Sequence, residues 1–96
     1  MAKGYWIAHV TVTDPDNYPK YLEAARPAFE KYGATFIVRG GQYAEVEGPA
    51  RERNVVVEFD SFETAKACYH SPEYAAAAKL RHAYADSDFV IVEGTD

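Results

Sequence analysis

Residues 4–13 read GYWIAHVTVT, and their side chains alternate between the two faces of a β-strand. Segments 34–39 and 54–60 show the same alternation. The apolar face of the three strands comprises Trp6, Ala8, Val10, Phe36, Val38, Val55, Val57 and Phe59. The opposite face carries one ionisable side chain from each strand, and these are His9, Arg39 and Glu58. Because burying charge is costly, such a set in an apolar sheet indicates either mutual pairing or a ligand.

Helical spacing appears in the segments between these strands. An apolar stripe predicts a first helix that ends at Gly33. The stripe consists of Tyr18, Leu22, Ala25, Phe29 and Tyr32. Ser61 is a suitable N-cap for a short second helix, and Ser71-Pro72 restarts it for a segment that runs to about Tyr84.

The remaining segments predict turns and one more strand. Gly40-Gly41 indicates a bulge or sharp bend, beyond which residues 42–47 could extend the second strand. The charged run at residues 51–54 is interpreted as a solvated loop. Residues 86–88 are interpreted as a turn, and residues 89–93 as the last strand.

The resulting order is strand, helix, strand, strand, helix, strand. This βαββαβ order predicts one α+β domain over residues 1–96, with a ferredoxin-like, four-stranded antiparallel sheet. Right-handed crossovers place the first and third strands at its centre. Both helices then cover the same face of the sheet.

The other face of such a sheet has no helix to cover it. Tyr5, Ile7, Ile37 and Val56 would leave apolar surface exposed there in a monomer. We therefore expect a homodimer in which two sheets face each other across a two-fold axis, forming a dimeric α/β barrel. The three ionisable residues would lie inside this barrel or at its rim.

Composition excludes several classes of partner. A net charge of -5 disfavours nucleic acid, because that binding requires clustered Lys and Arg. No stretch approaches the roughly 18 apolar residues that cross a bilayer, and the first residues show no signal sequence. We therefore expect no membrane partner and a cytoplasmic location. The single cysteine, Cys68, excludes an intrachain disulfide and a Cys-based zinc site. Its neighbours Ala65, Ala67 and Tyr69 favour a small buried hydrophobe over a reactive thiol.

Four short motifs carry a family resemblance. They are GYWIA at 4–8, RGG at 39–41, VEFDSF at 57–62 and SPEY at 71–74. In this order and spacing the chain resembles, over nearly its full length, the bacterial domain-of-unknown-function family 1330 of the dimeric α/β-barrel superfamily. The resemblance implies a ferredoxin-like dimer. Related barrel families include cofactor-free monooxygenases of aromatic substrates, lactone isomerases, haem-dependent peroxidases and ligand-sensing domains, and fold alone does not choose among these.

His9 and Glu58 are the candidate catalytic residues. Imidazole titrates near neutrality and can act as a general base, and a neighbouring Glu58 can orient it. Because their strands are adjacent at the centre of the predicted sheet, we expect the two side chains to lie close together. The alternative is that they only pair with each other inside the dimer interface.

The candidate ligand-binding residues are Arg39, Gly40, Gly41, Tyr5 and Tyr74. The planar guanidinium of Arg39 suits a carboxylate or enolate oxygen, and the two glycines let a ligand approach the backbone. The alternative for Arg39 is an ion pair with Glu58. Tyr5 could line an aromatic pocket, and Tyr74 lies at a helix start, where N–H groups attract anions.

These residues support one leading hypothesis. The protein is a small homodimer with a cofactor-independent pocket, between sheet and helices or at the barrel mouth, for a small carbonyl-bearing or aromatic metabolite. The reaction would be proton transfer or oxygenation, and the alternative is a non-catalytic ligand-binding or stress-related dimer. A metal- or haem-dependent enzyme ranks last because His9, His70 and His82 share no metal-ligand spacing, so we expect no metal and no cofactor.

Overall fold

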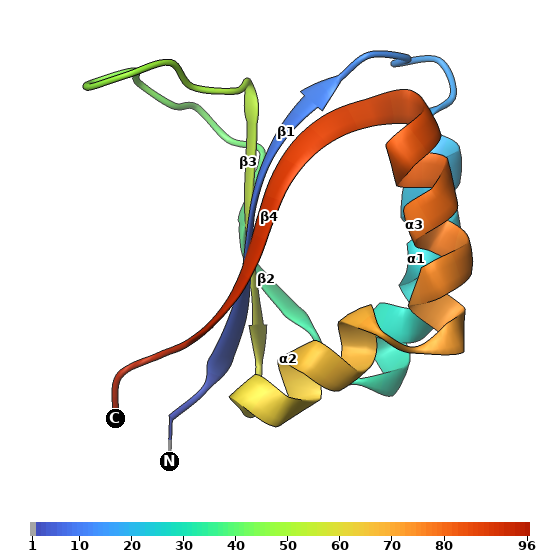
Figure 1. Cartoon of the computed structure of the whole chain (residues 1–96), viewed down its shortest axis with the longest axis vertical. Coiled ribbons are helices and arrows are strands. Elements are labelled where there is room, and N and C mark those ends of the chain that lie inside the picture. The colour runs from blue at the N-terminus through green and yellow to red at the C-terminus, as the bar shows by residue number, and fades with distance from the viewer. Residues whose placement is uncertain (1) are drawn as a thin grey trace.

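The computed structural model describes residues 2–96 and forms two layers. Its elements are β1 (Gly4–Val12), α1 (Tyr18–Lys31), β2 (Thr35–Arg39), β3 (Arg53–Phe59), α2 (Phe62–Tyr69), α3 (Pro72–Tyr84) and β4 (Ala85–Glu93). Figure 1 shows the helices on one side of the sheet, whose other face is uncovered. The predicted split of the second helical segment into a short and a longer helix is confirmed.

The sheet has the predicted topology. Its strand order is β2-β3-β1-β4, and each neighbouring pair is antiparallel, so β1 and β3 lie at the centre of a ferredoxin-like sheet. Both predicted serine caps are also present. The hydroxyl of Ser61 accepts a hydrogen bond from the N–H of Thr64 at 3.0 Å, and that of Ser71 accepts one from Tyr74 at 3.1 Å.

Trp6 of β1 connects the sheet to all three helices. Its side chain is only 1% exposed, and its indole N–H donates to the backbone carbonyl of Ala65 in α2 at 2.8 Å. Its ring packs against Phe29, Phe59, Tyr69, Tyr74 and Phe89, with centroids 4.9 to 5.8 Å away. Such aromatic contacts add to the free energy of burial, so Trp6 is the centre of the core.

β4 is longer than predicted. It begins at Ala85, directly after α3, and pairs with β1 along that strand's whole length, so the predicted turn at residues 86–88 is wrong. Asp86 and Asp88 have a low strand propensity. Because β1 offers an unpaired edge, their backbone groups gain ladder hydrogen bonds that a turn would not provide.

Residues 40–52 form a loop instead of extending β2, so the predicted strand at 42–47 is wrong. Gly40 and Gly48 have φ values of 64° and 74°, in the left-handed region that interrupts a strand. Figure 1 shows this loop projecting from the sheet on the side away from the helices. Arg53, interpreted as part of a solvated loop, is instead the first residue of β3.

Gly4 provides a test of how closely the sheet and α2 pack. A Cβ there would lie 2.3 Å from the carbonyl oxygen of Ser61 and 2.6 Å from the Cα of Phe62. Because both are backbone atoms, Gly4→Ala should lower the free energy of unfolding by about 2–3 kcal/mol, measured by urea unfolding at fixed protein concentration. Gly41→Ala is the control, since a Cβ there meets nothing within 4 Å, and it should change stability by less than about 0.5 kcal/mol. Equal losses in the two variants would contradict this interpretation.

Candidate functional site

A β-bulge in β2 decides where Arg39 lies. Phe36 pairs with Val57 and Val38 with Val56, which leaves Ile37 as an extra residue outside the ladder. Beyond the bulge Arg39 pairs with Val55, whose side chain is buried beneath the helices. The predicted placement of Arg39 on the same face as Glu58 is therefore wrong, because one inserted residue reverses the alternation. Arg39 instead stacks on the ring of Phe36, with its guanidinium 4.0 Å from the centroid.

Strand register also separates His9 from Glu58. In the β1–β3 pair His9 lies opposite Asn54, whereas Glu58 lies opposite Tyr5. Four residues along a strand span about 13 Å, so the expected contact between the two side chains is absent. The ring Nδ1 of His9 is 2.7 Å from the side-chain oxygen of Asn54. Glu58 accepts a hydrogen bond from the Tyr5 hydroxyl at 3.2 Å and pairs with Lys3 at 3.6 Å.

His9 lies beside a hollow on the uncovered face of the sheet. The hollow has a volume of about 590 Å³, and its lining includes His9, Tyr43, Arg51, Asn54 and Asp88. Arg51 pairs with Asp88 at 3.1 Å and donates to the hydroxyl of Thr11 at 2.9 Å, which ties the base of the loop to the sheet. The hollow is open to solvent in a single chain.

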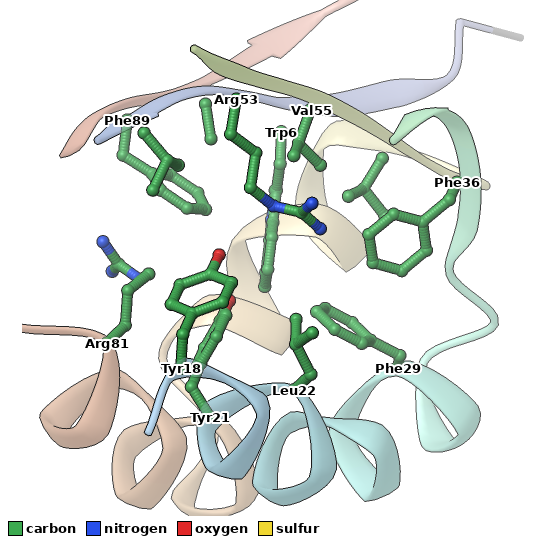
Figure 2. Close-up of a pocket in the computed structure, with 13 residues that line it drawn as sticks. Trp6, Tyr18, Tyr21, Leu22, Phe29, Phe36, Arg53, Val55, Arg81 and Phe89 are labelled. Atoms are coloured by element: carbon green, nitrogen blue, oxygen red, sulfur yellow. The ribbon is translucent and has the colours of Figure 1, made fainter. Parts of the chain in front are cut away.

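A second space, which we call the inner cavity, lies between the sheet and the helices. Several aromatic rings line it, and Figure 2 shows them converging from α1 and from the sheet. These rings belong to Trp6, Tyr18, Tyr21, Phe29, Phe36 and Phe89. The cavity volume is about 30 Å³, which is room for a water molecule.

Arg53 enters the inner cavity from β3. Figure 2 shows its guanidinium between the sheet layer and the side chains of α1, and its carbon Cζ lies 5.6 Å from the centroid of Tyr18. The Nε atom is buried and has no hydrogen-bond partner within residues 2–96. Gly40 lies against this side chain, since a Cβ there would be 2.7 Å from Nη1 of Arg53. The left-handed glycine after β2 thus leaves the space that the guanidinium occupies.

Arg81 enters the same cavity from α3. It is 3% exposed, and it donates to the hydroxyl of Tyr74 at 3.3 Å and to that of Ser87 at 2.5 Å. Its Nη2 atom is buried and unpartnered in the part of the chain that the structure describes. No carboxylate of residues 2–96 forms an ion pair with Arg81. A buried guanidinium held only by neutral hydroxyls is unusual, because buried charges are normally paired.

Tyr21 and Tyr74 support Arg81 through a buried hydrogen bond. Their hydroxyl oxygens are 2.8 Å apart. Burial raises the pKa of Tyr21 well above its ordinary value, and burial also raises the pKa of Tyr74 despite the opposing effect of the nearby Arg81 charge. Both hydroxyls therefore stay protonated at neutral pH and provide no negative charge for Arg81.

A groove adjoins the inner cavity between α1 and β2. Its volume is about 390 Å³, and it shares Leu22, Phe29, Phe36 and Arg53 with the inner cavity. Its other lining residues include Arg26 and Arg39, with Glu30 as the acidic one. Because the two spaces share these residues, we call the groove the mouth of the inner cavity, and Arg53 lines both.

The predicted site residues therefore lie in three places. Arg39 lines the mouth of the inner cavity, and Gly40 lies against the side chain of Arg53. Gly41 lines neither space, and a Cβ there would have no atom within 4 Å. Tyr5, His9 and Glu58 are on the uncovered face of the sheet. Tyr74 is wholly buried behind Arg81.

Sequence reasoning missed Arg53 and Arg81, although each had a signal. Arg53 alternates with Val55, Val57 and Phe59, which places it on the core face of β3. Arg81 follows Tyr74 and Ala77 at helical spacing on the buried stripe of α3. An arginine in register with core residues is the pattern that identifies both.

The chain matches the family described as Domain of unknown function (DUF1330) over residues 3–95. It belongs to this family. No curated protein matches the chain. None of the helices within residues 2–96 is long and apolar enough to span a membrane. In the same range, no three His, Cys, Asp or Glu side chains are grouped so that they could hold a metal ion.

Solved structures share the fold of this DUF1330 chain at low identity. A protein of unknown function from Rhodopseudomonas palustris is 18% identical with a TM-score of 0.79, over 99% of this chain and 84% of that one. The cofactor-independent oxygenase SnoaB from Streptomyces nogalater is 9% identical with a TM-score of 0.63, over 100% and 96%. A dimeric ferredoxin-like protein of unknown function from Thermobifida fusca is 18% identical with a TM-score of 0.53, over 99% and 92%.

Cys68 provides a test of core burial beside this site. It is fully buried, its thiol lies 3.7 Å from the carbonyl of Ala28, and burial raises its pKa to about 12. Because only the thiolate reacts, Ellman's reagent at pH 8 should modify native Cys68 at least about a hundredfold more slowly than the protein unfolded in guanidinium. Ala76→Cys in a Cys68→Ala background is the control, because position 76 is exposed on α3 and should react rapidly. Equal native rates for the two thiols would contradict the buried position of Cys68.

Proposed function

We propose that the protein is a small cytoplasmic homodimer of the dimeric α/β-barrel type that binds a small aromatic or carbonyl-bearing metabolite in the inner cavity without a cofactor. One observation carries this proposal: aromatic rings wall the cavity, and a guanidinium with an unpartnered, buried Nε separates it from a groove that leads to solvent. Ligand pockets combine such apolar walls with a few polar groups that fix the ligand's orientation.

The inner cavity has to open before a ring can enter. Its volume of about 30 Å³ is far below the roughly 150 Å³ of a cavity that holds benzene. Arg53 is a long, partly exposed side chain at the boundary with the groove of about 390 Å³. Rotation of this side chain joins the two spaces, and the joined volume accommodates a ligand of one or two rings.

The lining of the inner cavity favours binding over proton transfer. None of its lining residues within 2–96 is His, Asp or Glu, and Tyr21 stays protonated. The fold is shared with the cofactor-independent oxygenase SnoaB, which supports oxygenation as the reaction class to test once a ligand is bound. Ligand binding without turnover is the alternative for the same cavity.

Proton transfer by His9 is a second candidate function, located at the hollow on the uncovered face. The observation that favours it is that His9 lines this hollow together with Arg51, Asn54 and Asp88, all of them polar. A partner sheet would enclose the hollow. The hydrogen-bond partner of His9 there is Asn54, whereas Glu58 is bonded to Tyr5 at the other end of the strand pair, so this candidate assigns the proton transfer to His9 without Glu58.

A neutral aromatic amide distinguishes the two sites. We expect 2-naphthamide to bind and to change the fluorescence of Trp6, the only tryptophan and part of the cavity wall. Val55→Phe fills the inner cavity and should weaken binding at least about tenfold, measured by isothermal titration calorimetry with the fold checked by circular dichroism. His9→Ala should leave the affinity within about twofold. The opposite result, with loss of binding only in His9→Ala, would move the site to the outer hollow.

Homodimerisation is proposed because the uncovered face of the sheet is apolar. Val90 and Val92 of β4 and Val38 of β2 are 52%, 40% and 42% exposed on this face. Val46, in the loop that projects on the same side, is 86% exposed. A structure from Thermobifida fusca with this fold is described as dimeric, which supports the proposal. Packing two such faces together removes the apolar surface from water.

Val90→Glu tests the proposed interface. Val90 lies opposite Ile7, midway along the edge strand β4 on the uncovered face, so in the proposed dimer a carboxylate there would be buried against the partner sheet. We expect wild type to sediment at twice the chain mass and Val90→Glu at the chain mass, in analytical ultracentrifugation at micromolar concentration. Ala76→Glu adds the same charge on the exposed side of α3 and should remain dimeric. A monomeric wild type would overturn the proposed dimer.

A further inference from the structure

We propose that the ligand of the inner cavity is an organic anion, a planar aromatic carboxylate whose negative charge is neutralised by Arg53 and Arg81. This inference rests on the proposed function, because it assigns a ligand class to the same cavity. It follows from a charge imbalance: two arginines line the cavity, and no carboxylate of residues 2–96 lines it.

Arg81 is the first part of this imbalance. Its partners are the hydroxyls of Tyr74 and Ser87 and the ring of Phe89, 4.7 Å from its guanidinium carbon. All three are uncharged, since Tyr74 stays protonated, and Nη2 keeps an unused N–H donor in a buried position. Asp86 and Asp88 line a neighbouring hollow with Arg81 but form no ion pair with it. A carboxylate in the cavity would supply both the missing charge and the missing acceptor.

Arg53 is the second part. Its Nε is buried without a partner, and no carboxylate of the described chain pairs with it. The neighbouring ring of Tyr18 stabilises the cation through its face but does not accept the N–H. Two formal positive charges therefore line one aromatic cavity, and none of the described residues brings a negative charge to its lining.

The mouth of the cavity also carries an excess of positive charge. Arg26 and Arg39 line the groove together with Arg53, whereas Glu30 is its only acidic lining residue within 2–96. Arg26 pairs with Glu23 at 3.2 Å, and Arg39 has no ion-pair partner among the described residues. In a chain with a net charge of -5, this groove is a local concentration of positive charge. Such a groove attracts small anions and raises their rate of entry.

The aromatic part of the ligand follows from the rest of the lining. Beyond the two guanidinium groups and the tyrosine hydroxyls the wall is apolar, and the rings of Phe29 and Phe36 line both the cavity and its mouth. A free inorganic anion would gain the charge interaction but leave these rings uncovered. A carboxylate attached to a planar ring gains both the charge interaction and the apolar contact. The guanidinium fork matches the carboxylate, and the ring replaces water against the aromatic wall.

A matched pair of probes tests the charge independently of the ring. Wild type should bind 2-naphthoate at least about tenfold more tightly than 2-naphthamide, measured by calorimetry at pH 7, since the two differ only in the charged group. Arg53→Met and Arg81→Met should each reduce this preference to about threefold or less, mainly by weakening naphthoate binding. Lys79→Met is the control, because Lys79 is an exposed cation on α3 outside the cavity, and it should keep the wild-type preference. Inorganic phosphate at millimolar concentration should not displace naphthoate.

The outcomes separate the two proposals. Equal binding of both probes to wild type would overturn the anionic ligand while leaving the pocket in place. Binding of neither probe would overturn the pocket itself and this inference with it. A naphthoate preference that survives Arg53→Met would overturn the assignment of the charge to this cavity. Because Arg53 is partly exposed, that variant decides the question even where Arg81→Met fails to fold.

Discussion

The two-layer arrangement depends on Trp6. A fully buried indole has one N–H that must be satisfied, and the backbone carbonyl of Ala65 provides its acceptor. That bond fixes α2 against β1, and the ring then contacts aromatic side chains from all three helices. The same indole forms part of the wall of the inner cavity. The interaction that holds sheet and helices together therefore also shapes the space between them.

A single bulge in β2 places Arg39 on the helix side of the sheet and leaves the other predicted polar residues on the uncovered face. Without the extra residue at Ile37, Arg39 would join Tyr5, His9 and Glu58 on the uncovered face. With it, Arg39 turns towards α1 and lines the mouth of the inner cavity near Arg53. Bulges commonly redirect a side chain near functional sites, and here the redirected group is a cation.

Arg81 and Arg53 lower the stability that the same fold would have with apolar residues in their places. Each leaves a buried donor without a partner, which costs free energy in the absence of a ligand. A groove with further arginines leads to both. Groups that are poorly satisfied within the folded chain and converge on one cavity are the pattern expected of a binding site, where a ligand completes their interactions.

Sequence alone determined the order of strands and helices, the serine caps at Ser61 and Ser71, the buried face of β1, and the ferredoxin-like topology with β1 and β3 at the centre. These features arise from periodicity and capping among neighbouring residues, together with the handedness of the crossovers. The buried pattern of β3 also contained Arg53, which was interpreted as part of a solvated loop, and the buried stripe of α3 contained Arg81.

Tertiary structure alone decided which polar groups meet. The bulge at Ile37, the register that places His9 opposite Asn54, and the start of β4 at Ala85 are all set by hydrogen bonds between strands far apart in the chain. A shift of one residue in such a ladder moves a side chain to the opposite face at little change in local preference. That is why His9, Arg39 and Glu58 looked like one site in the sequence, while the folded chain brings Arg39 to Arg53 and leaves the other two on the uncovered face.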